Sequence, residues 1–354
     1  MTAPFLDTPE ALTNVLPLLS EQPRIAIDTE ADSLHCYFEK LCLVQVSVPG
    51  EDLLIDPLAG FSLAPLFETF AGKELVFHGA DYDLRLLKRN GFTEPTRLFD
   101  TMIAARLCGI TEFSLAALIK RFFGLELTKA SQKANWARRP LSPQMLEYAV
   151  NDTRFLLRLA DILKEDLCRL GRWTWFEQSC ERAIAAANVT KERDPEQLWR
   201  ISGSHELRGR ASAILRALWR WREEEAQAVD RPTFHILHNE QLVDAASRFD
   251  RGLEVEIKSL RGSRRKRFYE AGEKALVLPE SEWPTLPRGT RRPRPTPAQE
   301  DHFRTLKQKR DAVAAQLQLD PALIAPKSVL EAVAYEHEDA LSRLMPWQRE
   351  LLAL

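Results

Sequence analysis

Segments with the pattern of β-strands are concentrated in the first hundred residues of this chain, and they limit its possible folds more than any other feature. Strand-like apolar runs occupy residues 24–28, 41–48, 52–56 and 75–78. Apolar residues at helical spacing occupy residues 84–89, 102–107, 115–123 and 145–163. Three early strands, followed by a fourth strand among helices, predict a mixed sheet in an α/β domain over residues 1–190.

The second half of the chain has almost no strand pattern and carries a weak internal repeat. Pro321, Val329, Leu330 and Ala334 repeat the pattern of Pro232, Gln241, Leu242 and Ala246 at an offset of about 90 residues. We therefore predict two small all-helical domains, over residues 204–282 and 299–354. A linker rich in proline and arginine, residues 283–298, is expected to join them.

The composition limits the class of protein. A length of 354 residues allows two or three domains, and the formal net charge of −2 shows no basic excess. Nucleic-acid binding would therefore depend on local basic patches. No run reaches the roughly 18 uncharged apolar residues of a membrane helix, so we expect no membrane partner. The five cysteines lack a disulfide or zinc framework, and the N-terminus lacks a secretory signal, so we expect free thiols and a cytoplasmic protein.

Two pairs of polar residues have spacings that place their side chains together. Asp28 and Glu30 end the first predicted strand, and a period of two places both carboxylates on one face. A divalent cation would relieve their repulsion, and Mg²⁺ prefers such oxygens. A solvated strand end is the alternative. Tyr148 and Asp152 share one face of a predicted helix, although a surface tyrosine beside a surface aspartate would have the same spacing.

A further acid lies where the fourth strand turns into a helix. Asp83 is a candidate ligand there, and Asp81 competes with it for that role. Either carboxylate could instead simply favour the N-terminus of the helix through the helix dipole. Nearby, we expect His78 to be a structural hydrogen-bonding residue and Asp100 to cap or brace a helix.

The order of these acids resembles the DEDD superfamily of 3′→5′ exonucleases, in the branch whose last motif contains tyrosine. Within it, the chain is most similar to the ribonuclease D family. The segments Lys129–Leu141 and Leu98–Thr101 also fit that family, and the helical repeats resemble HRDC domains. The resemblance implies a ribonuclease H-like mixed-sheet α/β exonuclease domain followed by two small all-helical HRDC-like domains.

The same resemblance implies a reaction and a role for each acid. Two divalent metal ions, Mg²⁺ or Mn²⁺, would support hydrolysis of RNA from a free 3′ end to nucleoside 5′-monophosphates. Asp28 would bridge the ions, with Glu30 and Asp152 on the nucleophile side and Asp83 on the leaving-group side. The Tyr148 hydroxyl would orient the attacking water. The implied partners are tRNA precursors and other structured RNAs, and we expect a monomeric enzyme.

Basic residues near the site and in the helical repeat are the expected RNA contacts. The densest run is Arg264, Arg265, Lys266 and Arg267. Arginines also decorate the linker, at Arg288, Arg291, Arg292 and Arg294. A solvated charged face is the alternative for each run. Arg138 and Arg139 precede the third motif and could guide the 3′ strand, and Trp136 could stack on a base or lie in the core.

Two other functions are consistent with parts of this pattern. A DNA 3′→5′ exonuclease of the same fold would use the same acids, and contacts to the 2′-hydroxyl that discriminate RNA cannot be identified in the sequence. A catalytically silent RNA-binding scaffold would be expected to lack one of the motif residues. The presence of all five, Asp28, Glu30, Asp83, Tyr148 and Asp152, argues against such a scaffold.

Overall fold

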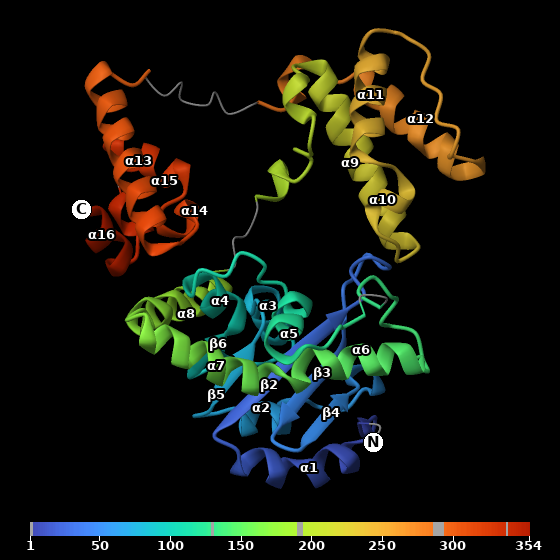
Figure 1. Ribbon diagram of the computed structural model, residues 1–354. Coiled ribbons are helices and arrows are strands. Elements are labelled where there is room, and N and C mark those ends of the chain that lie inside the picture. Colours follow the sequence, from blue (N-terminus) through green and yellow to red (C-terminus); the bar gives the residue numbers. More distant parts are fainter. Residues whose placement is uncertain (1–2, 129–130, 190–193, 286–293, 338) are drawn as a thin grey trace. The chain divides into compact units, whose positions relative to one another are not determined.

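The computed structural model describes residues 3–128, 131–189, 194–285, 294–337 and 339–354, in two compact units (Figure 1). The first unit comprises Met1–Ala31, Leu41–Thr190 and Pro293–Leu354. The second comprises Asp32–Lys40 and Lys191–Arg292. Among the described residues, no helix has both the length and the hydropathy needed to cross a membrane.

A six-stranded mixed sheet in the order β1-β4-β3-β2-β5-β6 forms the centre of the first unit. Its strands are β1 (Phe5–Leu6), β2 (Arg24–Ala31), β3 (Leu41–Val48), β4 (Glu51–Ile55), β5 (Glu74–Phe77) and β6 (Arg97–Asp100). β3 is antiparallel to β2 and β4, and the other pairs are parallel. The mixed sheet confirms the prediction. β1 was not predicted because two residues are too few to show a strand pattern, and β6 was not predicted because only Leu98 and Phe99 of its four residues are apolar.

β2 is longer than predicted, and this changes the setting of its two acids. The strand continues past residue 28 to Ala31, so Asp28 and Glu30 lie within it and not at its end. Antiparallel pairing with β3 sustains this part, with Asp28 opposite Gln45 and Glu30 opposite Leu43. The apolar pattern missed the extension because these positions are polar.

The helices of this unit lie on both sides of the sheet (Figure 1). They are α1 (Pro9–Glu21), α2 (Ala64–Thr69), α3 (Asp81–Arg89), α4 (Thr101–Leu107), α5 (Leu115–Phe123), α6 (Pro143–Arg154), α7 (Leu156–Arg169) and α8 (Trp173–Asn188). Of these helices, α1, α2 and α8 were not predicted. The helical spacing expected over 145–163 is confirmed, and it is shared by two helices because Phe155 interrupts the helix between α6 and α7. No glycine or proline marks that break, so the periodicity could not reveal it.

The second unit contains four helices among the described residues, and they surround a separate core. They are α9 (Arg210–Ala228), α10 (Thr233–Ile236), α11 (Asn239–Asp250) and α12 (Gly262–Leu276). Trp221 lies in this core with its ring centroid 5.0 Å from that of Phe268. The loop after β2 also belongs to this unit, because the Tyr37 hydroxyl donates to Glu223 and accepts from Gln227, each at 3.0 Å.

The C-terminal helices share the core of the first unit. They are α13 (Pro297–Leu317), α14 (Pro321–Ile324), α15 (Lys327–Ala334) and α16 (Pro346–Leu352). Trp347 of α16 stacks on Trp175 of α8 with centroids 5.0 Å apart. The Arg172 guanidinium donates to the carbonyls of Leu107 and Leu317, each at 2.7 Å, and so joins the ends of α4 and α13. Short 3₁₀ helices occur at Pro57–Ala59, Pro195–Gln197, Ser204–Glu206, Glu280–Glu282 and Leu341–Arg343.

The helical repeat has a structural counterpart. Arg222 and Arg310 are both buried, and each donates to the carbonyl of the residue that follows a short helix, Leu237 at 3.2 Å and Ala325 at 2.9 Å. Both members of the second pair lie 88 residues after those of the first. At this offset Leu242 and Ala246 match Leu330 and Ala334 as expected, whereas Pro232 matches Asp320 and not Pro321.

Candidate active site

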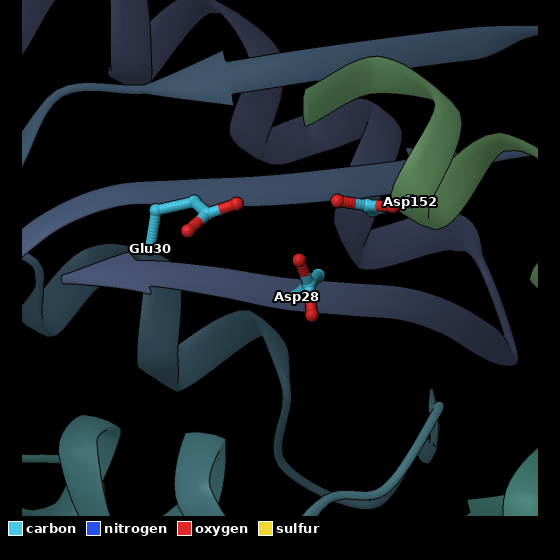
Figure 2. Close-up of side chains that lie close together, drawn as sticks. All are labelled: Asp28, Glu30 and Asp152. Carbon is cyan, nitrogen blue, oxygen red and sulfur yellow. The ribbon is translucent and has the colours of Figure 1, made fainter. Parts of the chain in front are cut away.

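Three carboxylates from two elements lie together at the face of β2. Oxygens of Asp28 and Glu30 on β2 and of Asp152 on α6 all lie within 4.8 Å of one another. Figure 2 shows the three side chains directed toward a common space, with Asp152 projecting from the helix beside the strand. The structure thus brings Asp152 together with two acids that precede it by 122 and 124 residues in the sequence. Three hard oxygen ligands at this separation suit a divalent ion such as Mg²⁺ or Mn²⁺.

Asp83 lies next to these three carboxylates, and Thr29 holds its side chain in place. Its side chain is buried at the start of α3, and one carboxylate oxygen accepts a 2.5 Å hydrogen bond from the Thr29 hydroxyl. Asp83 nevertheless raises the pKa of Asp28, Glu30 and Asp152 through like-charge repulsion. Asp81 is the more exposed competitor and forms an ion pair with Arg85. Of the two candidates, Asp83 is therefore the one beside the cluster.

Burial and mutual repulsion destabilise the ionised forms of the carboxylates at this site. Burial is the largest cause in each case, and it raises the pKa of Glu30 to about 9 and the pKa values of Asp83 and Asp152 to about 7. The pKa of Asp28 is also raised well above its ordinary value, by burial and then by its three acidic neighbours. These carboxylates are not a solvated strand end, so a bound cation is the natural stabiliser of their ionised forms.

Without a cation, the protein is expected to lose stability as the pH rises. An acid whose pKa is higher in the folded than in the unfolded protein contributes stability that is fully present below the unfolded-state pKa. This contribution is lost as the pH rises through the folded-state pKa. For Glu30 this window runs from 4.5 to about 9. We expect the melting temperature in EDTA to fall by on the order of 10 °C between pH 6 and pH 9. Circular dichroism melts would measure it. A Glu30→Gln control should show a smaller fall, and a wild-type fall no larger than that of the control would contradict the expectation.

Tyr148 is placed beside Asp152 by one turn of α6. Burial, followed by repulsion from Asp152 and the other acids, raises the pKa of the phenol, so its hydroxyl stays protonated. The Tyr148 ring packs against Trp136, with centroids 6.0 Å apart. Trp136 is only 1% exposed. The structure therefore corrects the expected stacking on a base: Trp136 occupies the core position that the sequence left open and supports Tyr148.

Arg139 is likewise committed to the fold. Its guanidinium donates to both oxygens of the buried Asp56, at 2.6 and 2.7 Å, and to the carbonyls of Trp136 and Cys42. These bonds fix the segment that supports Tyr148. The guanidinium is therefore not free to guide RNA, which corrects the expectation for Arg139. Arg138 is exposed and remains a candidate contact. Lys129 and Ala130, at the start of the family-like segment, lie outside the described residues.

The basic run Arg264–Arg267 forms part of α12 and is largely paired. Arg264 and Arg267 both form ion pairs with Glu225, at 3.1 and 2.5 Å. The Arg265 guanidinium lies over the Tyr269 ring, and Lys266 lies 3.7 Å from Glu270. The run has no acid within it, but the fold supplies acids from other positions. Of the linker arginines, Arg288, Arg291 and Arg292 lie outside the described residues, and Arg294 lies within them.

Two residues at the site were missed by sequence reasoning. Thr29 holds Asp83, and Gln45 of β3 lies with its Nε2 3.4 Å from an oxygen of Asp28. Gln45 is fully buried, and the strand register places it opposite Asp28. Neither is signalled by spacing within one segment. Strand pairing could have pointed to Gln45 had the register been known.

The supporting residues around the turn after β5 behave as expected. Asp100 caps α4 by accepting from the backbone of Met102 and Ile103, and it also accepts from Gly79 and Ala80. His78 lies 2.9 Å from the Thr101 hydroxyl through Nδ1. Gly79 has a φ of +82°, and a Cβ there would lie 2.9 Å from Met102. The turn that delivers Asp83 therefore requires glycine.

Known proteins resemble this chain in both halves. Residues 4–168 match a family model described as 3′-5′ exonuclease, and residues 211–267 match the HRDC domain model. Ribonuclease D of Gluconacetobacter diazotrophicus is 32% identical over 98% of this chain and 89% of its own length. Ribonuclease D of Xanthomonas oryzae pv. oryzae is also 32% identical, over 98% of this chain and 96% of its own.

Solved structures resemble it over the full length. A protein from Bifidobacterium adolescentis has a TM-score of 0.85 at 26% identity, over 99% of this chain and 95% of its own. Escherichia coli RNase D, described as an exoribonuclease involved in structured RNA processing, has a TM-score of 0.73 over 100% of this chain and 97% of its own. At 24% identity the latter likeness concerns the fold. The order of an α/β exonuclease domain before a helical HRDC domain is confirmed.

Proposed function

This chain belongs to the ribonuclease D family, and we propose on that premise that it is a metal-dependent enzyme that trims RNA from the 3′ end to nucleoside 5′-monophosphates. The observation that carries the proposal is the convergence of Asp28, Glu30 and Asp152 within 4.8 Å of one another. The five residues of the family motif are all present in order, Asp28, Glu30, Asp83, Tyr148 and Asp152. A silent scaffold would not need to keep four repelling carboxylates, one buried and three half-buried, close together.

The acids divide into two ligand sets in this proposal. Asp28, Glu30 and Asp152 would hold one divalent ion, and Asp28 with Asp83 would hold a second. When bound, the two ions would supply Lewis acidity at the phosphate and stabilise negative charge on the leaving 3′ oxygen. The Thr29 hydroxyl keeps the Asp83 carboxylate oriented at the edge of the cluster.

Tyr148 would position the attacking water. Its hydroxyl has one proton, which it would donate to the neighbouring Asp152 carboxylate. Its oxygen lone pairs are then available to accept a hydrogen bond from water. The raised pKa of the phenol keeps this proton in place at neutral pH, so Tyr148 would orient the water and would not act as the base.

RNA would be held by exposed basic residues and by the helical modules. Arg138 near the site, and Arg265 and Lys266 on α12, are the proposed phosphate contacts, with Arg264 and Arg267 in a supporting position through Glu225. We propose residues 204–282 and 299–354 as two HRDC-like modules, because the buried arginine contact recurs in both. We further propose tRNA precursors as substrates and a monomeric enzyme. All five cysteines are free, which supports the reducing cytoplasm as its compartment.

Digestion of a 5′-labelled, 3′-extended tRNA precursor would test the proposal. With Mg²⁺ or Mn²⁺ we expect products shortened one nucleotide at a time from the 3′ end, and in EDTA we expect no products. The same RNA with a 3′-phosphate is the matched control and should resist degradation. DNA of the same sequence, if degraded faster, would favour the DNA exonuclease instead. RNA binding without any hydrolysis would contradict the proposal and favour the scaffold.

A further inference from the structure

A relay of hydrogen bonds runs from the residue after Asp152 into the sheet. The hydroxyls of Thr153 on α6 and Ser47 on β3 lie 2.7 Å apart. Ser47 in turn donates to Oδ1 of Asp52 on β4 at 2.6 Å. Since the single Ser47 proton goes to Asp52, Thr153 must be the donor to Ser47. Each hydroxyl along this path therefore has a fixed direction.

A second contact closes the relay on the same carboxylate. Arg154 donates from Nε to Oδ2 of Asp52 at 2.7 Å, so Asp52 holds two consecutive residues of α6. Ser47 and Thr153 are almost completely buried, at 2% and 1% exposed. The strand register places Ser47 directly opposite Asp52, which makes this anchor part of the β3–β4 hairpin. Buried, fully paired hydroxyls of this kind fix geometry more tightly than apolar packing does.

The position of Asp152 on α6 explains why an anchor is needed there. The helix ends at Arg154, two residues after Asp152, and a one-residue interruption at Phe155 separates it from α7. The buried apolar residues of α6 in its local core are Ala149 and Val150, both earlier in the helix. The terminal turn of a helix loosens unless its groups are held from outside. The bonds from residues 153 and 154 to the hairpin supply that hold.

We propose that this relay, Thr153–Ser47–Asp52 closed by Arg154, positions the Asp152 carboxylate and thereby sets the affinity of the site for its divalent cation. The inference rests on the proposed metal site and adds residues to it that the motif does not contain. Thr153, Ser47 and Asp52 are positioning residues, because their hydrogen bonds hold the turn of α6 that carries Asp152. Outer residues that orient a metal ligand typically contribute 10-fold to 100-fold in metal affinity.

Substitution at Thr153 separates the hydroxyl from the packing. Thr153→Val keeps the shape of the side chain and removes the donor, and we expect it to raise the Kd for Mn²⁺ by about 10-fold. Thr153→Ser keeps the donor and should stay within about 2-fold of the wild type. Thr69→Val is the matched control, since its buried hydroxyl donates to Leu66 within α2. Mn²⁺ binding would be measured on the full chain by electron paramagnetic resonance of the free ion, without RNA.

A double-mutant cycle shows whether the effect acts through Asp152. In an Asp152→Asn background, titrated to millimolar Mn²⁺, Thr153→Val should cause no further loss. Ser47→Ala breaks the same relay from the sheet and should reproduce the 10-fold loss, including where Thr153→Val fails to fold. An unchanged Kd in folded Thr153→Val, or an equal loss in the Asp152→Asn background, would overturn the inference alone. Absence of Mn²⁺ binding by the wild type would overturn the metal site and this inference together.

Discussion

Replacing Asp28 by asparagine is expected to reduce RNA hydrolysis by more than about 1,000-fold. Asp28 is the acid that the proposal assigns to both ions, and loss of several kcal/mol of charge stabilisation in the transition state corresponds to such a factor. The measurement is the initial rate on a 3′-labelled RNA at saturating Mg²⁺. Asp81→Asn is the control, because the Asp81 carboxylate pairs with Arg85 at the surface. It should keep activity within about 2-fold of the wild type.

The same variant is expected to fold and to be more stable than the wild type when metal is absent. The pKa of Asp28 is raised by burial and by Asp83, Asp152 and Glu30, so the ionised carboxylate opposes folding near neutral pH. The neutral amide removes that charge. A melt in EDTA at pH 8 should therefore show a higher melting temperature for Asp28→Asn. Near-wild-type degradation by the folded variant would contradict the assignment of Asp28.

Removing the phenolic hydroxyl of Tyr148 is expected to lower kcat by about 100-fold with KM nearly unchanged. Tyr148→Phe keeps the ring that packs on Trp136 and deletes the group that would orient water. Steady-state kinetics on a short single-stranded RNA would separate the two constants. Tyr335→Phe, in the C-terminal helices, is the matched control and should match the wild type. A raised KM at unchanged kcat would instead indicate that Tyr148 contacts the RNA.

The acidic cluster could be predicted because its members follow the two regular periods of the backbone. A spacing of two on a strand aligns Asp28 with Glu30, and a spacing of four on a helix aligns Tyr148 with Asp152. The order of the motifs then selected the family. No local period, however, could show that Thr29 would hold Asp83 or that Gln45 would face Asp28. Those contacts depend on which strands and helices become neighbours.

The RNA contacts were harder to predict because charge and aromatic character do not report burial. The run Arg264–Arg267 contains no acid, yet Glu225 of α9 forms ion pairs with both Arg264 and Arg267. Arg139 is of the residue type that contacts phosphates, but its guanidinium binds Asp56, which lies 83 residues earlier in the sequence. The same holds for the aromatic residue Trp136. The sequence could not show whether its ring stacks on an RNA base or packs in the protein core. In each case a long-range partner determined the outcome.

The domain organisation was predicted from pattern, but the association of its parts was not. Apolar spacing indicated the C-terminal helices, whereas the stacking of Trp347 on Trp175 joins them to α8 of the exonuclease unit. Similarly, the loop of residues 32–40 follows β2 in sequence but packs with α9 of the second unit. Both associations depend on individual side chains, and the periodicity of apolar residues does not distinguish these side chains from other apolar or loop residues.

Anomalous scattering from crystals grown with Mn²⁺ tests most directly whether these carboxylates hold two cations. We expect two Mn²⁺ peaks in the anomalous difference map, one in contact with Asp28, Glu30 and Asp152 and one in contact with Asp28 and Asp83. Both peaks should disappear or weaken strongly in Asp28→Asn crystals. A map in which Mn²⁺ at millimolar concentration lies elsewhere, while Asp83 stays bonded to Thr29, would contradict the proposed site.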